Sequence, residues 1–487
     1  KSGQAFTVQP KIQIQDADSN LVNTGAASSA QVRITVSSDA YDSAAHTGVN
    51  LTGSANFELS TASAGEATFA SARLEGVAAT YTLKFETLNT SGFNGVTASQ
   101  TLALTAGTET HLAVVQQPTA IIAGAAFSPA VTVEILDDWN NRVLDVSNTV
   151  SVKPTLVDAA ISGSTIDATK SAVANSSGLV TFTGLTFTKA ATQYVRFTTT
   201  AGLTSATSSS FTITNAQAHH LTWVNAAATF SAKNDYAIKD AANANPELEV
   251  RDQYENPVLT GNATTVVVTE STSSADVRAI SGASISSNSS ARVSFANLVM
   301  RAKAGSYTLN FTASNGSLPI NGDVATATVS ISFGDPSALR LTRNAAGANV
   351  DLPFTTQPKL NIEDTAGNVV ADSGLAVTVS ENVSQVLSGT TTKSATAGSV
   401  DFTDSGLKLS GTVETGLRLK YAVTYNGTEI STSQDIDLDP GLAINLTIGQ
   451  QPTTVQTRVA FSPVPTVILR DGSGNRVTSD NSSTVTA

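Results

Sequence analysis

The chain has 487 residues, a net charge of −12, no cysteine and only 14% charged residues. Without cysteine, disulfides, zinc–thiolate sites, iron–sulfur clusters and thiol nucleophiles are all excluded. No cluster of Lys and Arg interleaves with aromatic residues, so the basic footprint that nucleic-acid binding needs is missing. No apolar run reaches 18 residues, so the sequence predicts no membrane-spanning helix.

A short alternating run near the start of the chain is the first copy of an internal repeat. Ile12 and Ile14 precede Asp16, Asn20 follows that Asp by four residues, and Val22 follows it by six. The pattern recurs at Asp137, Asp252, Asp364 and Asp471, with successive intervals of 121, 115, 112 and 107 residues. The residues two and four positions before each Asp are always apolar, and a period of two places them on one face of a strand. We expect this face to point into the core, and its residues are Ile12, Ile14, Val133, Ile135, Leu248, Val250, Leu360, Ile362, Val467 and Leu469.

Further strands follow each turn in the same order. In the first copy they are expected at 32–36, 65–69, 81–85 and 102–104. Each later copy also begins with an apolar run before its turn: 111–115, 220–224, 338–341 and 444–448. About seven short alternating strands in about 100 residues is typical of a two-sheet sandwich.

The sequence therefore predicts an all-β fold of tandem immunoglobulin-like antiparallel β-sandwiches with Greek-key connections. The expected domains are 1–106, which lacks its first strand, then 107–216, 217–334 and 335–440, and an incomplete repeat at 441–487. The short linkers between them predict a semi-rigid rod. Because the first and last repeats are incomplete, we expect the sequence to be part of a longer array of repeats. Strand exchange between chains is the alternative.

Several strings resemble a known family of repeats. Gln116-Gln117-Pro118-Thr119 recurs as Gln450-Gln451-Pro452-Thr453, and the turn reads Asp-x-x-Gly-Asn-x-Val. These strings resemble the bacterial Ig-like repeats of very large surface proteins and of invasin/intimin-type adhesins. Asn140 and Glu255 stand where that family favours Gly. The resemblance implies an extracellular, cell-surface location.

Each Asp–Asn turn has two interpretations. The structural one is an Asx-turn, in which Asp accepts backbone N–H bonds and Asn or Gly tolerates positive φ; it applies to Asp137, Asn141, Asp252, Asn256, Asp364, Asn368, Asp471 and Asn475. The other is calcium, for which Asp16, Asp18 and Asn20 place three oxygen ligands at alternate positions. Calcium is the one ion that the sequence suggests, and no other cofactor is expected.

No pattern predicts catalysis. The adjacent His219 and His220 would face opposite sides of a strand, and no nucleophile elbow, HExxH motif or phosphate-binding loop occurs. We therefore expect no enzyme activity and name no catalytic or cofactor-binding residue.

Eleven Asn-x-Ser/Thr sequons are candidate sites of glycosylation. They begin at Asn50, Asn89, Asn175, Asn262, Asn288, Asn310, Asn315, Asn382, Asn426, Asn445 and Asn481.

Two function classes fit these observations. The first is a structural subunit of an extracellular fibre, stalk or surface layer that associates with copies of itself, end to end and laterally. The second is an adhesin arm that binds glycans or proteins of a host or a surface. Near-equivalent repeats without a distinctive end domain favour the first.

Overall fold

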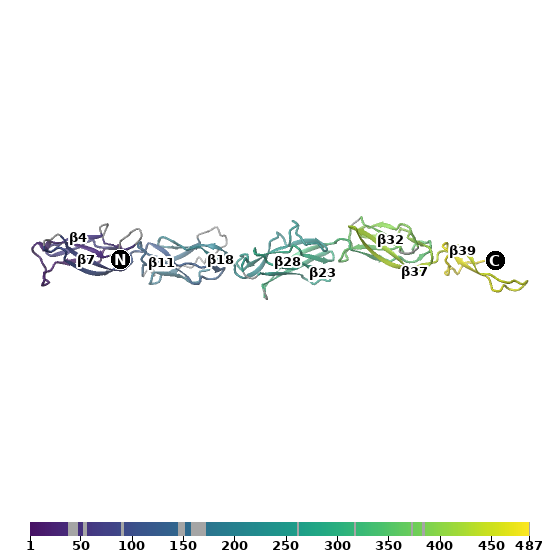
Figure 1. The fold of residues 1–487 in the computed structure, drawn as a ribbon, viewed down its shortest axis with the longest axis horizontal. Coiled ribbons are helices and arrows are strands. Elements are labelled where there is room, and N and C mark those ends of the chain that lie inside the picture. Colours follow the sequence, from purple (N-terminus) through teal and green to yellow (C-terminus); the bar gives the residue numbers. More distant parts are fainter. Residues whose placement is uncertain are drawn as a thin grey trace. The chain divides into compact units, whose positions relative to one another are not determined.

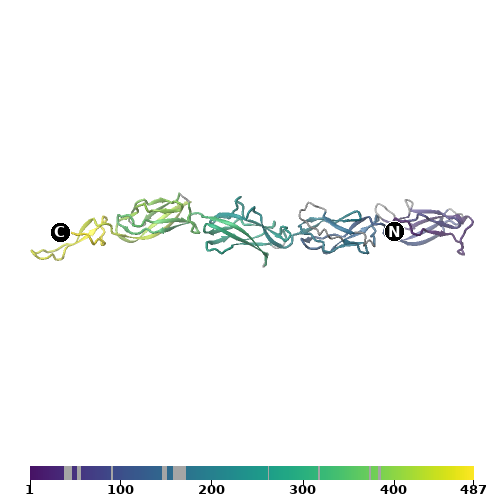
Figure 2. The same cartoon turned by 180° about the vertical axis from the view of Figure 1, so that it is seen from behind.

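A computed structural model describes residues 1–37, 47–51, 56–88, 92–144, 151–156, 172–260, 263–315, 318–371, 374–381 and 385–486. These residues form two compact units, Lys1–Gln217 with Asp252–Thr260, and Ala218–Arg251 with Gly261–Ala487. Strands make up each repeat (Figures 1 and 2), and the only helical turn in the described ranges is the 3₁₀ turn Ala26–Ser29.

The first repeat has two two-stranded sheets and one four-stranded sheet. Strand β1 (Lys11–Gln13) pairs with β5 (Glu66–Thr68), and β3 (Val49–Leu51) pairs with β6 (Leu74–Gly76). The larger sheet has the order β4–β2–β7–β8, from β2 (Gln31–Ser37), β4 (Phe57–Thr61), β7 (Thr80–Leu88) and β8 (Thr97–Ala103). The core between the sheets includes Ile34, Phe69 and Phe85.

Compared with the first repeat, the second repeat has an additional edge strand, which pairs with the strand that precedes the Asp. Its sheet β14–β11–β9 joins β9 (His111–Gln116), β11 (Val131–Leu136) and β14 (Leu179–Phe182). The other strands are β10 (Ile121–Ile122), β12 (Ser151–Leu156), β13 (Ala172–Val173), β15 (Ala191–Gln193), β16 (Val195–Thr199), β17 (Ala206–Thr207) and β18 (Phe211–Thr214). They form sheets of order β10–β18–β15 and β13–β12–β16–β17.

The third repeat pairs a three-stranded with a five-stranded sheet, in the orders β19–β21–β25 and β20–β28–β27–β22–β24. Its strands are β19 (Ala218–Trp223), β20 (Thr229–Lys233), β21 (Glu247–Asp252), β22 (Thr265–Glu270), β23 (Val277–Ser281), β24 (Ser284–Ser286), β25 (Arg292–Ser294), β26 (Val299–Ala302), β27 (Gly305–Asn315) and β28 (Leu318–Ser332).

The fourth repeat has the same topology, with sheets β29–β31–β35 and β30–β38–β37–β32–β34. Its strands are β29 (Ala338–Arg343), β30 (Ala348–Asn349), β31 (Lys359–Glu363), β32 (Ala376–Glu381), β33 (Val386–Ser388), β34 (Thr392–Ser394), β35 (Ser399–Asp401), β36 (Lys408–Ser410), β37 (Glu414–Tyr425) and β38 (Thr428–Asp439). After it, β39 (Asn445–Gln450) pairs with β40 (Thr466–Arg470).

The predicted all-β fold of tandem Ig-like sandwiches is confirmed. One detail differs from the purely antiparallel expectation, because β10, β20 and β30 pair in parallel with the last strand of their repeats. The chain enters each complete repeat along one sheet and then crosses to the edge of the other, so its second strand runs in the same direction as the last.

The exposed fraction of the apolar residues before each Asp shows whether a second sheet covers that strand. Val133, Leu248 and Leu360, four residues before their Asp, are all 0% exposed. The equivalent Ile12 is half-buried, and Val467 is 46% exposed, so the expectation that Val467 faces a core is wrong. In residues 441–486 the strands β39 and β40 form one two-stranded sheet, and nothing in those residues covers it with a second sheet.

Candidate functional site

The five Asp–Asn turns share one internal geometry. The fourth is typical: Asp364 Oδ1 accepts the N–H of Ala366 and of Asn368, both at 2.9 Å, and the backbone N–H of Asp364 donates to the carbonyl of Asn368. The Asn368 amide also donates to Asp364 Oδ2 at 2.9 Å. One carboxylate thus closes the turn at the end of its strand.

The positive φ of each turn falls on the residue before the Asn. These residues are Ser19, Asn140, Glu255, Gly367 and Gly474, with φ between 57° and 86°. The turn therefore does not require Asn for its backbone conformation, in contrast to the sequence interpretation. The amide side chain of this Asn has another use.

In four turns the Asn amide binds the backbone of the preceding repeat. Asn368 Nδ2 donates to the carbonyl of Ala302 at 3.0 Å, and its Oδ1 accepts the N–H of Ala304 at 2.7 Å. Asn141, Asn256 and Asn475 do the same with Gly76 and Ala78, Thr188 and Ala190, and Gly411 and Val413. The amide pairs with two backbone groups on alternate residues, as a neighbouring β-strand would.

The carboxylate of the same turns binds the linker. Asp364 Oδ2 accepts the N–H of Gly334 at 2.8 Å, and Asp137, Asp252 and Asp471 accept those of Gly107, Ala216 and Gly441 at 2.6 to 3.0 Å. All four carboxylates are at most 3% exposed. We call this set of bonds, from one Asp–Asn turn to the preceding repeat and linker, a joint.

Among the residues that the structure describes, the first turn has the internal bonds only. Asp16 Oδ1 accepts the N–H of Asp18 at 3.0 Å and of Asn20 at 2.9 Å, and the Asn20 amide donates to the same carboxylate. Asp16 and Asn20 are both exposed. The same motif therefore occurs four times within a joint and once on a bare surface.

Hydrogen bonding keeps two of the joint carboxylates acidic. Burial on its own raises the pKa of Asp364, but the N–H of Gly334 and the Asn368 amide outweigh it and hold the pKa below the ordinary value. For Asp471 burial likewise raises the pKa, while Asn475 and the N–H of Gly441 lower it further than burial raises it. Both groups are carboxylates when the joint is formed.

Acid should weaken these joints. Because the folded-state pKa of Asp364 lies below the ordinary 3.8, its contribution is complete above that pH and is lost as the pH falls through the lower folded-state value. In Asp364→Asn, an N–H₂ group would face the N–H of Gly334, so the variant is less stable at neutral pH. We expect the difference in free energy of unfolding between wild type and variant to narrow from about pH 6 to about pH 2. A difference that stays constant over that range would contradict this.

Calcium at Asp16, Asp18 and Asn20 stays a prediction. Within the described residues no group of three His, Cys, Asp or Glu side chains lies close enough to hold a metal. The calcium interpretation requires that excess chelator lower the melting temperature of the first repeat, because a ligand of the native state stabilises it by mass action. Asp18→Asn should abolish that response. A melting curve that chelator leaves unchanged would leave the Asx-turn as the sole role of these residues.

The sequons differ in accessibility. Asn175, Asn288, Asn426, Asn445 and Asn481 are exposed, Asn310 is half-buried, and Asn50 is buried within β3. Asn89, Asn262 and Asn382 lie outside the described residues, as does the side chain of Asn315. A glycan on Asn50 would require the β3–β6 pair to open, so glycosylation remains a proposal for the exposed sites alone.

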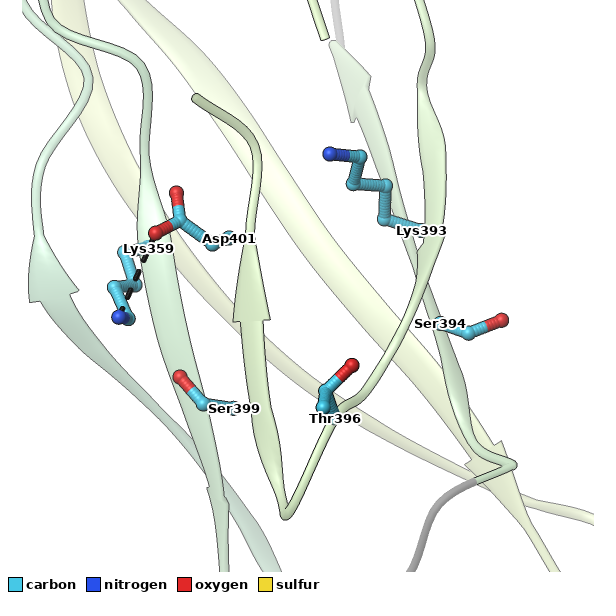
Figure 3. A pocket seen from close by; sticks show the side chains of 6 residues that line it. All are labelled: Lys359, Lys393, Ser394, Thr396, Ser399 and Asp401. Carbon is cyan, nitrogen blue, oxygen red and sulfur yellow. Dashed lines mark ion pairs between the residues drawn. The ribbon is translucent and has the colours of Figure 1, made fainter. Parts of the chain in front are cut away.

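The fourth repeat carries a polar hollow of about 410 Å³ where the edges of its two sheets meet. Figure 3 shows Lys359 beside Asp401, with Lys393 and Ser394 on a neighbouring strand. Lys359 Nζ lies 3.5 Å from Asp401 Oδ2. The Thr403 hydroxyl and the Arg343 guanidinium hold the pKa of Asp401 far below its usual range. Small-molecule sites are usually lined by apolar side chains, so this ion-paired hollow does not identify a ligand.

His219 and His220 lie in β19 with 3.3 Å between their Nδ1 atoms and 5.5 Å between their ring centroids, so the expectation that they face opposite sides of the strand is wrong. No described segment forms a helix of the length and apolarity that crossing a bilayer requires.

No protein-family model matches the chain, and no curated protein matches it in sequence. Among solved structures it is similar to the Escherichia coli adhesin FdeC, with 17% identity over 69% of this chain and 100% of that one and a TM-score of 0.31. It is also similar to the human desmocollin-1 ectodomain, with 9% identity over 94% and 82% of the two chains and a TM-score of 0.27. Protocadherin γB7 repeats 3–6 give 11% identity, coverage of 84% and 93%, and a TM-score of 0.31. Similarity at this level carries no argument about function.

Proposed function

We propose that the chain is a structural segment of an extracellular surface fibre, stalk or surface layer, in which Asp–Asn turns link successive Ig-like repeats. The observation that supports this most is the joint, which recurs four times with the same side-chain and backbone atoms. A tandem array transmits load or holds a spacing only if each repeat is fixed to its neighbour. Buried charge-assisted bonds at every connection meet that requirement.

The alternative, an adhesin arm that binds glycans or proteins, has less support. Recognition sites of that kind usually present aromatic side chains in a hollow, and the hollow on the fourth repeat is lined by Lys, Asp, Ser and Thr. We therefore assign no ligand to this hollow.

Removing one joint amide tests the proposal inside a single chain. Asn368→Ala deletes the bonds to Ala302 and Ala304 of repeat three, so the coupling between repeats three and four should fall by about 1–3 kcal/mol. It also deletes the bond to Asp364 within repeat four. In calorimetry the two repeats should then unfold at more widely separated temperatures.

The matched control is Asn20→Ala, which removes the same side chain from a turn whose bonds, among the described residues, are internal. It should leave the coupling between repeats three and four unchanged. Equal effects of the two substitutions would show that the amide stabilises its own turn and nothing more, which would remove the main support for a linked array.

The surface location has its own test. Antibody raised against the chain should label intact cells of the source, and brief external protease treatment should remove the label. Labelling that appears only after the cells are permeabilised would contradict an extracellular role.

A further inference from the structure

Each joint depends on a short backbone segment of the preceding repeat, and we number the joints by that repeat. In the third joint the segment is residues 302–304, whose outer residues Ala302 and Ala304 give a carbonyl and an N–H to the Asn368 amide. Because the Asn pairs with alternate residues as a strand would, the carbonyl of the middle residue, Lys303, is left for a different partner. A bond to that carbonyl holds the segment from a second direction.

Tyrosine hydroxyls bind the middle carbonyl in two joints. The Tyr307 hydroxyl donates to the carbonyl of Lys303 at 2.7 Å. In the first joint the Tyr81 hydroxyl donates to the carbonyl of the middle residue, Val77, also at 2.7 Å. Each Tyr follows its middle residue by four positions and lies on the strand that leaves the segment, β27 or β7. We call a side chain that donates to the middle carbonyl a clamp.

The fourth joint has a clamp of a different residue type. Its segment is 411–413, and the carbonyl of the middle residue, Thr412, accepts the side-chain N–H of Gln385 at 3.0 Å. Gln385 is buried, and a Cβ on Gly411 would overlap its Oε1, so glycine leaves room for this clamp. Since Tyr and Gln make the same bond from different parts of the fold, the bond itself is the shared feature of these joints.

The second joint has no clamp among the described residues. The residue four positions after its middle residue, Lys189, is Gln193, at the end of β15. Its side chain is 0% exposed, and neither of its polar atoms has a hydrogen-bond partner in the described part of the chain. A buried amide without partners costs stability, so the position that holds Tyr in the first and third repeats is unsatisfied in the second.

We infer that the clamps Tyr81, Tyr307 and Gln385 are positioning residues for the joints, and that each acts on the following repeat through the backbone segment that the Asn binds. The inference rests on the proposed function, because it requires that the joints couple the repeats. A tyrosine that bonds to the backbone a few residues upstream is common in Ig-like sandwiches, where it fixes a corner between strands. In this chain the same corner binds the next repeat, so the clamp also sets how firmly that repeat is held.

Hydrogen exchange at Ala304 tests the clamp, because its N–H donates to the Asn368 amide oxygen. In the full chain, Tyr307→Phe removes only the hydroxyl, and this N–H should exchange about ten-fold faster, the effect of one net hydrogen bond. Thr308→Val, which removes a hydroxyl from the exposed neighbouring residue, should leave the rate unchanged. Equal acceleration at Ala304 and at Leu309, inside β27, would mean that Tyr307 only stabilises its own repeat, and would overturn the inference.

The variant Asn368→Ala separates the clamp from the joint. It removes the acceptor itself, so it should accelerate exchange at Ala304 whether or not the clamp acts. If Asn368→Ala has this effect and Tyr307→Phe has none, the inference is overturned while the coupling of the repeats stands. If neither variant has an effect, the joint gives no protection and the proposed function fails together with the inference.

The unaltered chain offers an independent comparison. The N–H of Ala190 in the second joint donates to Asn256 Oδ1 at 2.8 Å, as that of Ala304 does to Asn368, but its segment has no clamp among the described residues. After correction for the neighbouring side chains, Ala190 should exchange about ten-fold faster than Ala304. Both rates can be read on the full chain by mass spectrometry with peptide fragmentation. Equal rates would overturn the inference.

Discussion

Replacing Asp364 with Ala should destabilise the fourth repeat by about 3 kcal/mol, because it leaves buried N–H groups without an acceptor. The carboxylate accepts the N–H groups of Ala366, Asn368 and Gly334 as well as the Asn368 amide. Alanine offers no acceptor, and the side chain is only 3% exposed, so water replaces these bonds poorly. Denaturant unfolding of the full chain measures the loss.

The matched control is Asp16→Ala, which removes the same residue from an exposed turn. Water can solvate the N–H groups of Asp18 and Asn20 there, so the melting temperature of the first repeat should change much less. If both substitutions cost the same, the Asp would serve the turn alone and the buried joint would add nothing to stability.

Phe311→Ala should have an effect of similar size on the third repeat, about 3–5 kcal/mol, because it opens a cavity in a packed core. The Phe311 ring is fully buried and meets the rings of Trp223 at 5.0 Å and Phe295 at 5.3 Å between centroids. Trp223 lies on β19, so removing the Phe311 ring also weakens the packing of the strand that closes this sandwich. The unfolding transition of the third repeat, followed by Trp fluorescence, should move to lower denaturant.

Phe57→Ala is the control for this substitution, since that ring is 39% exposed on the surface of the first repeat. A loss below about 1 kcal/mol is expected there. A comparably small loss at Phe311 would mean that the core of the third repeat closes around the missing ring.

Local patterns predicted most of the fold. The alternation before each Asp correctly assigned Ile14, Val133, Leu248 and Leu360 to the core, because one buried face dictates the phase of a strand. The same rule failed at Val467, since alternation identifies the face of a strand but not whether a second sheet covers it.

The joints could not be predicted from local pattern. Asn141 binds Gly76 and Ala78, more than sixty residues away in the sequence. Its partners there are backbone atoms, which every residue type offers, so they leave no pattern in the sequence. One signal was present in the sequence: the Asn recurs in all five copies, while the residue before it varies among Ser, Asn, Glu and Gly. The varying residue has the positive φ. An invariant side chain beside a variable strained position indicates that the amide itself has a partner.

The backbone character of the joint has a consequence for how such a chain can change over time. Each Asn amide binds a carbonyl and an N–H whose residues are Gly76 and Ala78 in one joint, Thr188 and Ala190 in the next, and Gly411 and Val413 in the last. No side chain of the preceding repeat has to match. A repeat can therefore be duplicated, deleted or exchanged by recombination and still fit its new neighbour, provided that it retains the Asp and the Asn four residues later.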